Sequence, residues 1–485
     1  MKNTFSSVFL FAMALEAGAA VQVAKPFADH AVLQRGRPVP VWGVAAPGEA
    51  VEISFAGVTV KTAADGKGKW RLDLPPMKES AEGRTLTVKG TANTVEIKDV
   101  LVGEVWFVGG QSNAVCPFWC EKGPRFRDLK GAMIAQYVHR PLIRCTTKPG
   151  SWTVFEPANL VDVTHPAGGS NDGFSAMGVY FALELHAALG VPVGMIGAYA
   201  NGTGIDTWIP REGYETRPDL KDMMEWVRPK KWTKDCVKGP IIAWHQQPSF
   251  LWEGSVAPWT PYALRGVLWN QGDSNVVDAP RYCSKMHALY NGWAKNFGNP
   301  DLKLYYVEQG RVDGSCWELQ RQQAKFAVEQ PNAAMSGGND LAVPDVHGKD
   351  KEMEARRLLL HALKHDYGFA DIRAESPALA SWKIDGDAFV LSFSNARTLY
   401  VYNKDFSLKA DLEIAGEDGV WRHADITNFT NAGWASEGYI GSPDLIVRAK
   451  GVPAPKKVRY LAKPPTVGNI YNEVCLPLLP FEAGE

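Results

Sequence analysis

The sequence predicts an α/β protein in which a parallel-sheet domain stands between two β modules, and three observations support this prediction. Residues 21–99 and 369–485 alternate apolar and polar side chains in short runs, as strands with one buried face do. Residues 100–368 instead alternate continuous apolar runs with helical periodicity, which indicates a parallel sheet covered by helices on both faces. The length of 485 residues leaves room for about two to four domains.

The first β module is predicted from its short amphipathic strands. Residues 51–55 and 70–74 alternate apolar and polar side chains, and Asp65-Gly66 marks a turn between them. We therefore expect a small antiparallel, sandwich-like β domain over residues 21–99.

The central domain is predicted from buried strands that alternate with helices. Apolar residues at helical spacing predict one helix over residues 174–189 and another over residues 351–365. Four apolar residues are expected on the buried side of the second helix: Leu358, Leu359, Ala362 and Leu363. Continuous apolar runs predict five strands, at residues 105–108, 191–199, 266–269, 304–307 and 333–335.

The last β module is predicted from two hairpin patterns. Residues 382–393 alternate apolar and polar side chains around an Asp385-Gly386 turn. Residues 412–421 show the same alternation and contain an Asp418-Gly419 turn. A C-terminal β module over residues 369–485 follows from this pattern.

The N-terminus carries the features of a signal peptide. Lys2 precedes an apolar run at residues 8–15, and Ala17-Gly18-Ala19 resembles a small-residue cleavage site. We expect residues 1–20 to be removed and the mature chain to be exported to the periplasm or the cell exterior. No later apolar stretch reaches the roughly 20 residues that span a bilayer, so no membrane span is predicted.

Charge and composition narrow the possible partners. Lys and Arg number 52 against 53 for Asp and Glu, a net charge of 52 − 53 = −1, so the chain has no positive excess to neutralise nucleic acid. The 17 tryptophans are compatible with flat apolar sugar surfaces as ligands, although most tryptophans serve protein cores. Nucleic acid is therefore not an expected partner.

Cysteine and histidine spacing does not indicate a metal or a fixed disulfide framework. Seven cysteines leave at least one without an intramolecular partner, and their connectivity stays open. Cys116 and Cys120 lack a second such pair or a matching histidine, so no zinc site is predicted there. His361 and His365 lie four apart on a predicted helix, but no Glu follows His361, so both are expected to be surface histidines.

A candidate nucleophile follows the first apolar strand of the central domain. Residues 109–113 read Gly-Gly-Gln-Ser-Asn, which places Ser112 at the carboxyl end of a parallel strand, where open α/β sheets bind their ligands. The glycines allow a sharp turn and close approach of a substrate. A serine hydroxyl needs a base, and His347 is the candidate because it lies in a polar loop between a predicted strand and a predicted helix.

Two further loops at strand ends supply amide groups. Residues 269–275 follow one apolar strand, and residues 201–204, with Asp206 and Trp208, follow another. Any one of these segments is explained equally well as an ordinary loop. Together with the segments of Ser112 and His347, these two loops place a nucleophile, a base and hydrogen-bond donors on one edge of a sheet, as acyl transfer requires.

These segments resemble the ordered blocks of the sialate O-acetylesterases, within the SGNH hydrolase superfamily. The resemblance is carried by residues 110–113 (Gly-Gln-Ser-Asn), 271–275 (Gln-Gly-Asp-Ser-Asn) and 345–347 (Asp-Val-His). It covers nearly the whole chain, because residues 27–34 and 469–481 are similar to the start and the end of that family.

The resemblance implies a flavodoxin-like three-layer SGNH hydrolase domain, flanked by β modules, that removes acetyl groups from sialic acids. Ser112 matches the nucleophile and His347 the base, and either Asp345 or Asp273 orients His347. Oxyanion donors are expected from Gly202, Gln271 and the N–H of Ser112. Other side chains of the same loops are expected to contact the substrate: Gln111, Asn113, Asp206, Trp208 and Asn275. The reaction needs no metal or organic cofactor.

Several alternatives stay open. Asp273 stands where the family usually has Glu, which puts the reach of its carboxylate in doubt, and we favour Asp345 as the orienting group. Another acetylated carbohydrate, such as xylan, pectin or a host glycan, would use the same catalytic residues. A carbohydrate-binding protein without activity is the second alternative. Three arginines near the blocks are candidates to bind a sialate carboxylate, or else ordinary surface residues: Arg265, Arg281 and Arg311.

Overall fold

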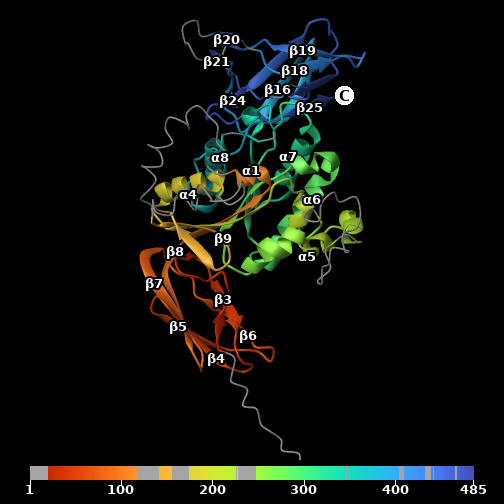
Figure 1. The fold of residues 1–485 in the computed structure, drawn as a ribbon. Helices are drawn as coiled ribbons and strands as arrows, with labels where there is room; N and C mark the ends of the chain where they lie inside the picture. The colour runs from red at the N-terminus through yellow and green to blue at the C-terminus, as the bar shows by residue number, and fades with distance from the viewer. Residues whose placement is uncertain are drawn as a thin grey trace, which may run out of the picture.

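The two β modules lie at opposite ends of the central sheet domain, as the computed structural model shows (Figure 1). The N-terminal module, drawn in red and orange, is farthest from the C-terminal module, drawn in blue. The described residues are 20–116, 141–155, 174–225, 227, 247–345, 347–348, 350–403, 409–431, 439–440, 442–464 and 467–485. The predicted signal peptide, apart from its last residue, lies outside them.

The central sheet is parallel and has β8 (Thr94–Gly110) in its middle. The five core strands run in the order β11-β8-β12-β13-β14, so the first strand lies between the second and the third. The other four are β11 (Val193–Tyr199), β12 (Gly266–Asn270), β13 (Lys303–Val307) and β14 (Ala333–Ser336). A hairpin of β9 (Ile143–Lys148) and β10 (Ser151–Val154) extends the sheet beyond β11. All five predicted strands are confirmed.

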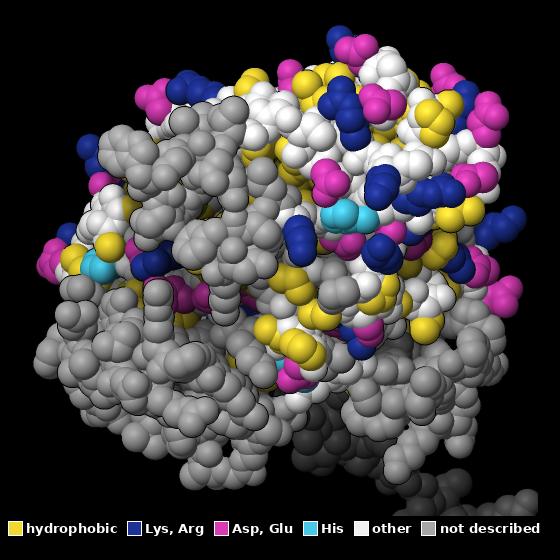
Figure 2. All heavy atoms as spheres, turned by 90° about the horizontal axis from the view of Figure 1, so that it is seen from above, with side chains coloured by type: hydrophobic (Ala, Val, Ile, Leu, Met, Phe, Trp, Pro, Cys, Tyr) yellow, Lys and Arg dark blue, Asp and Glu magenta, His cyan; other side chains and the backbone are white. Residues whose placement is uncertain are grey.

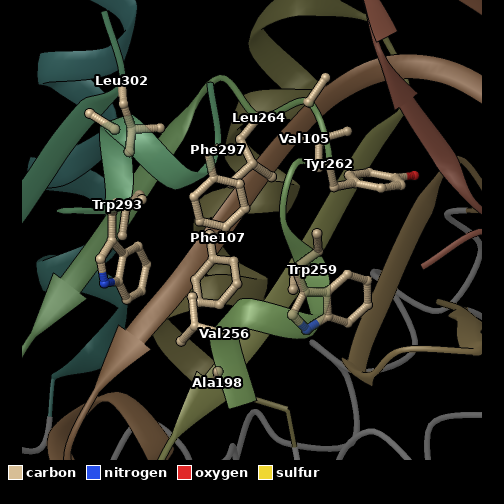
Figure 3. Packing of buried hydrophobic residues seen from close by; sticks show 14 of the residues in the cluster. Val105, Phe107, Ala198, Val256, Trp259, Tyr262, Leu264, Trp293, Phe297 and Leu302 are labelled. Atoms are coloured by element: carbon tan, nitrogen blue, oxygen red, sulfur yellow. The ribbon is translucent and has the colours of Figure 1, made fainter. Parts of the chain in front are cut away.

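Helices cover both faces of this sheet. Successive strand residues point to opposite faces, so a continuous apolar run puts apolar side chains on both faces. Trp106 and Val108 of β8 pack in one core with α4 (Ala176–Leu189) and α8 (Lys351–Asp366). Phe107 belongs to the other core, where its ring contacts Trp293 of α6 (Tyr282–Asn296) with centroids 5.2 Å apart (Figure 3). The predicted α/β class and both predicted helices are therefore confirmed.

The second face also holds α7 (Trp317–Glu329), whose Leu319 and Phe326 join the core of Phe107. A shorter helix, α5 (Arg211–Glu215), packs against α6. All four residues predicted on the buried side of α8 are buried, between 0% and 8% exposed. His361 is an exception to the prediction of surface histidines: it is 1% exposed, because its position on α8 faces Tyr305 in the sheet.

Part of the N-terminal module extends the central sheet, whereas β1 (Gln22–Val23), β3 (Val39–Val44) and β6 (Lys69–Leu74) form a separate three-stranded sheet. The first half of β8 pairs with β7 (Ser80–Lys89), and its second half pairs with β11 and β12. The predicted boundary at residue 99 thus falls inside one continuous strand. The remaining strands are β2 (Val32–Gln34), β4 (Ala50–Phe55) and β5 (Val58–Ala63).

The C-terminal module is a mainly antiparallel β structure that contacts the central domain. Its largest sheet has the order β15-β16-β22-β19-β18-β23-β25. Asn339 of the central domain donates a hydrogen bond to the Leu478 carbonyl, and its own carbonyl accepts one from Gly468 N–H at 3.3 Å. The strands are β15 (Ala378–Asp385), β16 (Ala388–Ser394), β17 (Leu399–Val401), β18 (Leu412–Ala415), β19 (Trp421–Ile426), β20 (Thr430–Asn431), β21 (Tyr439–Ile440), β22 (Asp444–Ala449), β23 (Lys457–Tyr460), β24 (Ile470–Asn472) and β25 (Phe481–Gly484).

The described surface carries both positive and negative side chains, as the near-zero net charge predicts. Lys and Arg side chains are interspersed with Asp and Glu over the described part of the face in Figure 2, which carries no single-sign field. No helix in the described ranges is both long and apolar enough to cross a membrane. Cys145, Cys283, Cys316 and Cys475 are free thiols, whereas Cys120 and Cys236 lie outside the described residues.

Candidate active site

Three strand ends meet at Gly110, and this register builds the site. Gly110 of β8 is level with Tyr199 of β11 and Asn270 of β12, so the loops that follow these strands leave the sheet side by side. Gln111 N–H donates to the Asn270 carbonyl at 3.1 Å, and Ala200 N–H donates to the Gly110 carbonyl at 3.2 Å. Gly110 has φ +138°, and a Cβ there would lie 2.1 Å from the Asn270 oxygen, so the close approach requires glycine.

Ser112 begins a single helical turn, α1 (Ser112–Val115), directly after that glycine. Its side chain is half-buried, whereas the flanking Gln111 and Asn113 are buried. The structure thus leaves Ser112 as the partly accessible residue of the block, as a nucleophile needs to be. Figure 1 places α1 at the sheet edge that faces the C-terminal module.

The side-chain amides of Gln111 and Gln271 join the loops at this edge of the sheet by hydrogen bonds. The Gln111 oxygen accepts hydrogen bonds from Gln271 Nε2 and Gly272 N–H, both at 3.2 Å. Gln271 is fully buried; its Nε2 also faces the Thr203 carbonyl at 3.1 Å, and its oxygen accepts from the Tyr282 hydroxyl at 2.7 Å. The predicted roles of Gln271 as an oxyanion donor and of Gln111 as a substrate contact stay predictions.

The predicted contacts of Asp206, Trp208 and Asn275 with substrate stay predictions, and in the structure these side chains contact other parts of the protein. Trp208 is completely buried and packs edge-on against Trp269, with ring centroids 6.1 Å apart. Asn275 is 3% exposed, and its Nδ2 donates to Asp206 Oδ2 at 3.2 Å. Asp206 in turn forms an ion pair of 2.8 Å with buried Lys285. These residues brace the loop below the site because the chain folds back over α6 here.

Gly202 remains compatible with its predicted role. It lies on an exposed turn with φ +65°, and a Cβ there would meet nothing within 4 Å. Its backbone can therefore approach a substrate closely. The assignments of Gly202 N–H and Ser112 N–H as oxyanion donors stay predictions.

A buried polar chain connects Ser112's neighbour to three other elements, and sequence reasoning missed most of it. Asn113 donates to Asp273 at 3.0 Å and accepts from Lys351 Nζ at 3.0 Å. Lys351 is fully buried and pairs with Glu354 at 2.8 Å. Glu354 accepts from Asn270 Nδ2 at 2.8 Å. Asn113 thus joins the Ser112 block to Asp273 and to α8, and its predicted contact with substrate stays a prediction.

Burial shifts the pKa values of the carboxyl groups in this hydrogen-bonded network. It raises the pKa of Asp273, and the nearby charges of Arg311, His347 and Lys351, together with the hydrogen bond from Asn113, oppose that rise. Burial likewise raises the pKa of Glu354, against the pull of Lys351. The influence of His347 on Asp273 means that the imidazole and this carboxylate are within electrostatic range of each other.

The structure brings Asp345 close to His347. Nδ1 of His347 lies 3.7 Å from Asp345 Oδ1, an ion-pair distance but longer than a hydrogen bond. Both side chains are nearly half exposed, at 43% and 45%. Within the described residues no hydrogen bond joins His347 to Ser112. Catalytic hydrogen bonds are often long before substrate binds and tighten in the complex.

The two carboxylates predict different mutational effects. Asp345→Asn removes the charge beside His347 Nδ1 and is expected to lower kcat by roughly 100-fold or more. Asp273→Asn keeps an oxygen that accepts from Asn113 and should lower kcat less. Steady-state kinetics on a chromogenic acetate checks this order. A larger loss in Asp273→Asn would assign the orienting role to Asp273.

Buried Glu308 anchors the loop that carries His347. Its Oε2 accepts from Gly338 N–H at 2.9 Å and from Asn339 N–H at 3.2 Å, at the start of η10 (Asn339–Leu341). Its Oε1 has no hydrogen-bond partner in the described part of the chain. Burial raises the pKa of Glu308 to about 7.

This carboxyl predicts a pH-dependent stability. Because the folded pKa of Glu308 lies above the unfolded value, its contribution is complete below about pH 4.5 and is lost as pH rises through about 7, on the order of 3 kcal/mol. Glu308→Gln should flatten the fall in the free energy of unfolding between pH 5 and pH 8. Urea denaturation at several pH values measures this slope. An unchanged slope would show that Glu308 does not titrate in this range.

A pocket of about 660 Å³ adjoins Asp345. Arg311 and Asp313, which are 3.3 Å apart, line it together with Pro464 from the C-terminal module. Arg311 is therefore the arginine that the structure places beside the site. Arg265 pairs with Glu104 at the opposite end of β12, and Arg281 pairs with Asp222.

A family model, two related proteins and one crystal structure all match this chain to acetylesterases. A family model described as carbohydrate esterase, sialic acid-specific acetylesterase, matches residues 102–355. Sialate O-acetylesterase of Rattus norvegicus is 24% identical over 442 residues, 80% of this chain and 81% of the rat protein. The Homo sapiens enzyme of the same name is 24% identical over 410 residues, 75% of this chain and 74% of its own length. The crystal structure of a carbohydrate acetylesterase from Xanthomonas citri superposes with a TM-score of 0.77 at 26% identity, covering 96% of this chain and 99% of that one.

Proposed function

Because this chain belongs to the sialic acid-specific acetylesterase family of carbohydrate esterases, we propose that it hydrolyses O-acetyl esters on sialic acids through an acetyl-serine intermediate. Its activity class is that of a carboxylic ester hydrolase. One observation carries the proposal. Half-buried Ser112 stands at the end of β8 beside Asn113, which donates a hydrogen bond to Asp273, and the charge of His347 acts on the same Asp273 carboxylate.

The proposed reaction is acyl transfer to water. His347 takes the proton of Ser112 as the hydroxyl oxygen attacks the acetyl carbonyl carbon. The N–H groups of Ser112 and Gly202 stabilise the oxyanion, and the sugar oxygen leaves with the proton from His347. Water then attacks the acetyl-serine with His347 again as base, which releases acetate and restores the serine. Asp345 holds the imidazole in the required tautomer.

The strand order supports a finer fold assignment. In chain order the core strands read 2-1-3-4-5, which is the flavodoxin-like order. In such sheets the ligand binds where the order reverses, here between β8 and β12, and that is where Ser112 and Asp273 lie. We infer a flavodoxin-like three-layer SGNH hydrolase domain.

A second substrate class has its own support. The pocket beside Asp345 offers two carboxylates, Asp313 and Asp345, against the single guanidinium of Arg311. This charge balance does not favour an anionic sugar, so a neutral acetylated carbohydrate is the alternative substrate. Acetate release from O-acetylated sialic acid, compared with release from acetylated xylan fragments, tests the proposal directly.

A variant of Arg311 adds a second test to the comparison of the two substrates. If Arg311 binds the sialate carboxylate, Arg311→Gln should lower kcat/KM for O-acetylated sialic acid by roughly 10- to 100-fold, because a charged hydrogen bond is worth about 1.5–3 kcal/mol. The value for xylan fragments should change little. Arg281→Gln is the control, since its ion pair with Asp222 lies outside the pocket. Faster turnover of xylan by the unaltered protein, or equal losses in Arg311→Gln, would favour the neutral substrate.

We also propose that the mature chain is exported. Lys2, the apolar run and the small residues at 17–19 support this. The mass of the chain recovered from the cell exterior or periplasm tests it, and a mass that includes residues 1–20 would oppose cleavage.

A further inference from the structure

His361, His365 and Glu375 form a cluster at the far end of α8 from the active site. Lys351 starts α8 beside Asn113, and His365 lies 14 residues later, about 20 Å along the helix axis. One ligand atom of each member of the cluster lies within 4.8 Å of the other two. His365 Nε2 and Glu375 Oε1 are 3.1 Å apart. Ligands on a tetrahedral zinc ion, each about 2.0–2.1 Å from the metal, are separated by a similar distance.

His361 is the observation that points to a ligand. Its side chain is 1% exposed, and neither ring nitrogen has a hydrogen-bond partner among the residues described. A neutral imidazole carries a lone pair on one ring nitrogen, and that nitrogen is the atom that binds a metal ion. A buried imidazole without any partner is costly, and a bound ion would satisfy it.

We propose that His361, His365 and Glu375 bind a divalent transition-metal ion of the zinc class. Two imidazoles and one carboxylate are a donor set that zinc accepts, with water in the fourth position. Lys364 occupies Glu375 Oε2 at 2.5 Å and leaves Oε1 for the metal. The His361 and His365 rings lie 9° from parallel, with centroids 6.1 Å apart.

The ion would act as a brace between two regions of the protein. Glu375 lies three residues before β15, where the chain enters the C-terminal module. A metal bound to it and to α8 would fix the start of that module against the central domain. Because metal binding to the folded state stabilises it by mass action, the ion should raise the melting temperature.

A second cluster provides a matched control. Cys283 and His287 lie four apart on α6, and Glu329 Oε2 lies 2.9 Å from His287 Nε2 and 3.5 Å from Cys283 Sγ. Each of these groups already has a partner. Burial raises the pKa of Cys283 to about 12, so metal binding there must also form an unfavourable thiolate. The first cluster is therefore the favoured site.

Zinc titration of the chelator-treated full chain, in competition with a chromophoric indicator, tests the proposal. We expect one zinc per chain, and His365→Gln and Glu375→Gln should each weaken its binding by roughly 100-fold or more. His287→Gln should leave binding unchanged. Both His365 and Glu375 reach solvent, so these variants are expected to fold, and far-ultraviolet circular dichroism checks this.

Two further readouts make the outcome decisive. Cobalt in the site should give the visible absorption of a tetrahedral complex in the unaltered chain and in His287→Gln, but not in His365→Gln. Zinc should raise the melting temperature in the same pattern. Equal zinc binding by His365→Gln, loss of binding in His287→Gln, or no saturable binding at micromolar zinc would each overturn the assignment.

Discussion

Ser112→Ala is expected to lower kcat/KM for acetyl esters by roughly three orders of magnitude or more, because the attacking oxygen is removed and only transition-state binding remains. The variant should fold normally, since Ser112 is half-buried and removing one hydroxyl from it leaves no buried cavity. Hydrolysis of a chromogenic acetate measures the loss. A burst of one equivalent of the chromogenic alcohol per active site, before steady-state turnover, would report the acetyl-serine.

Ser274→Ala is the matched control for this experiment. Ser274 lies in the neighbouring loop at the same edge of the sheet, and its backbone N–H donates to Gln111 at 3.3 Å. Replacing its side chain keeps that hydrogen bond. Activity lost in Ser274→Ala and kept in Ser112→Ala would move the nucleophile to the other loop and refute the mechanism.

The sequence was sufficient to place the loops after β8, β11 and β12 at one edge of the sheet. Apolar runs predict the strands, and the carboxyl ends of parallel strands share an edge, so Ser112 and His347 were expected there. The register at Gly110 confirms that the loops after β8, β11 and β12 leave together. Strand pattern carries this information because it depends on local sequence and on burial.

The sequence was not sufficient to say which way the polar side chains of these loops point. Gln271 follows a strand as Ser112 does, yet its amide is enclosed by the Thr203 carbonyl and the Tyr282 hydroxyl. Trp208 was expected at the substrate, but it completes an aromatic core with Trp269. Side-chain direction in an irregular loop is set by tertiary partners, and these come from elements far away in sequence.

The burial of the ion pair between Lys351 and Glu354 could likewise not be predicted from the sequence. Helical periodicity predicts α8, and an i,i+3 pair of opposite charges at its start is ordinarily expected on a solvated surface. In the fold, the first turn of α8 docks beneath α1, so Lys351 meets Asn113, which is 238 residues away. Only this docking makes the pair a buried one.

Lys351→Met is therefore expected to destabilise the protein by about 3–5 kcal/mol, the usual cost of leaving one partner of a buried ion pair without its counter-charge. Both side chains are nearly inaccessible, at 0% and 6%, so water cannot replace the lysine. Urea denaturation measures the free energy of unfolding. Activity should also fall, because Asn113 loses the hydrogen bond that helps to fix it beside Ser112.

A double-mutant cycle with Glu354→Gln separates charge from packing. Glu354→Gln keeps one oxygen to accept from Asn270 but leaves Lys351 without its carboxylate. The double variant has no buried charge at either position, so it should be more stable than the sum of the two single losses predicts, by roughly 1–3 kcal/mol. Additive losses would mean that the two side chains act independently. In that case the polar chain from Asp273 through Asn113 would have to be held by packing of α8 against α4 rather than by this ion pair.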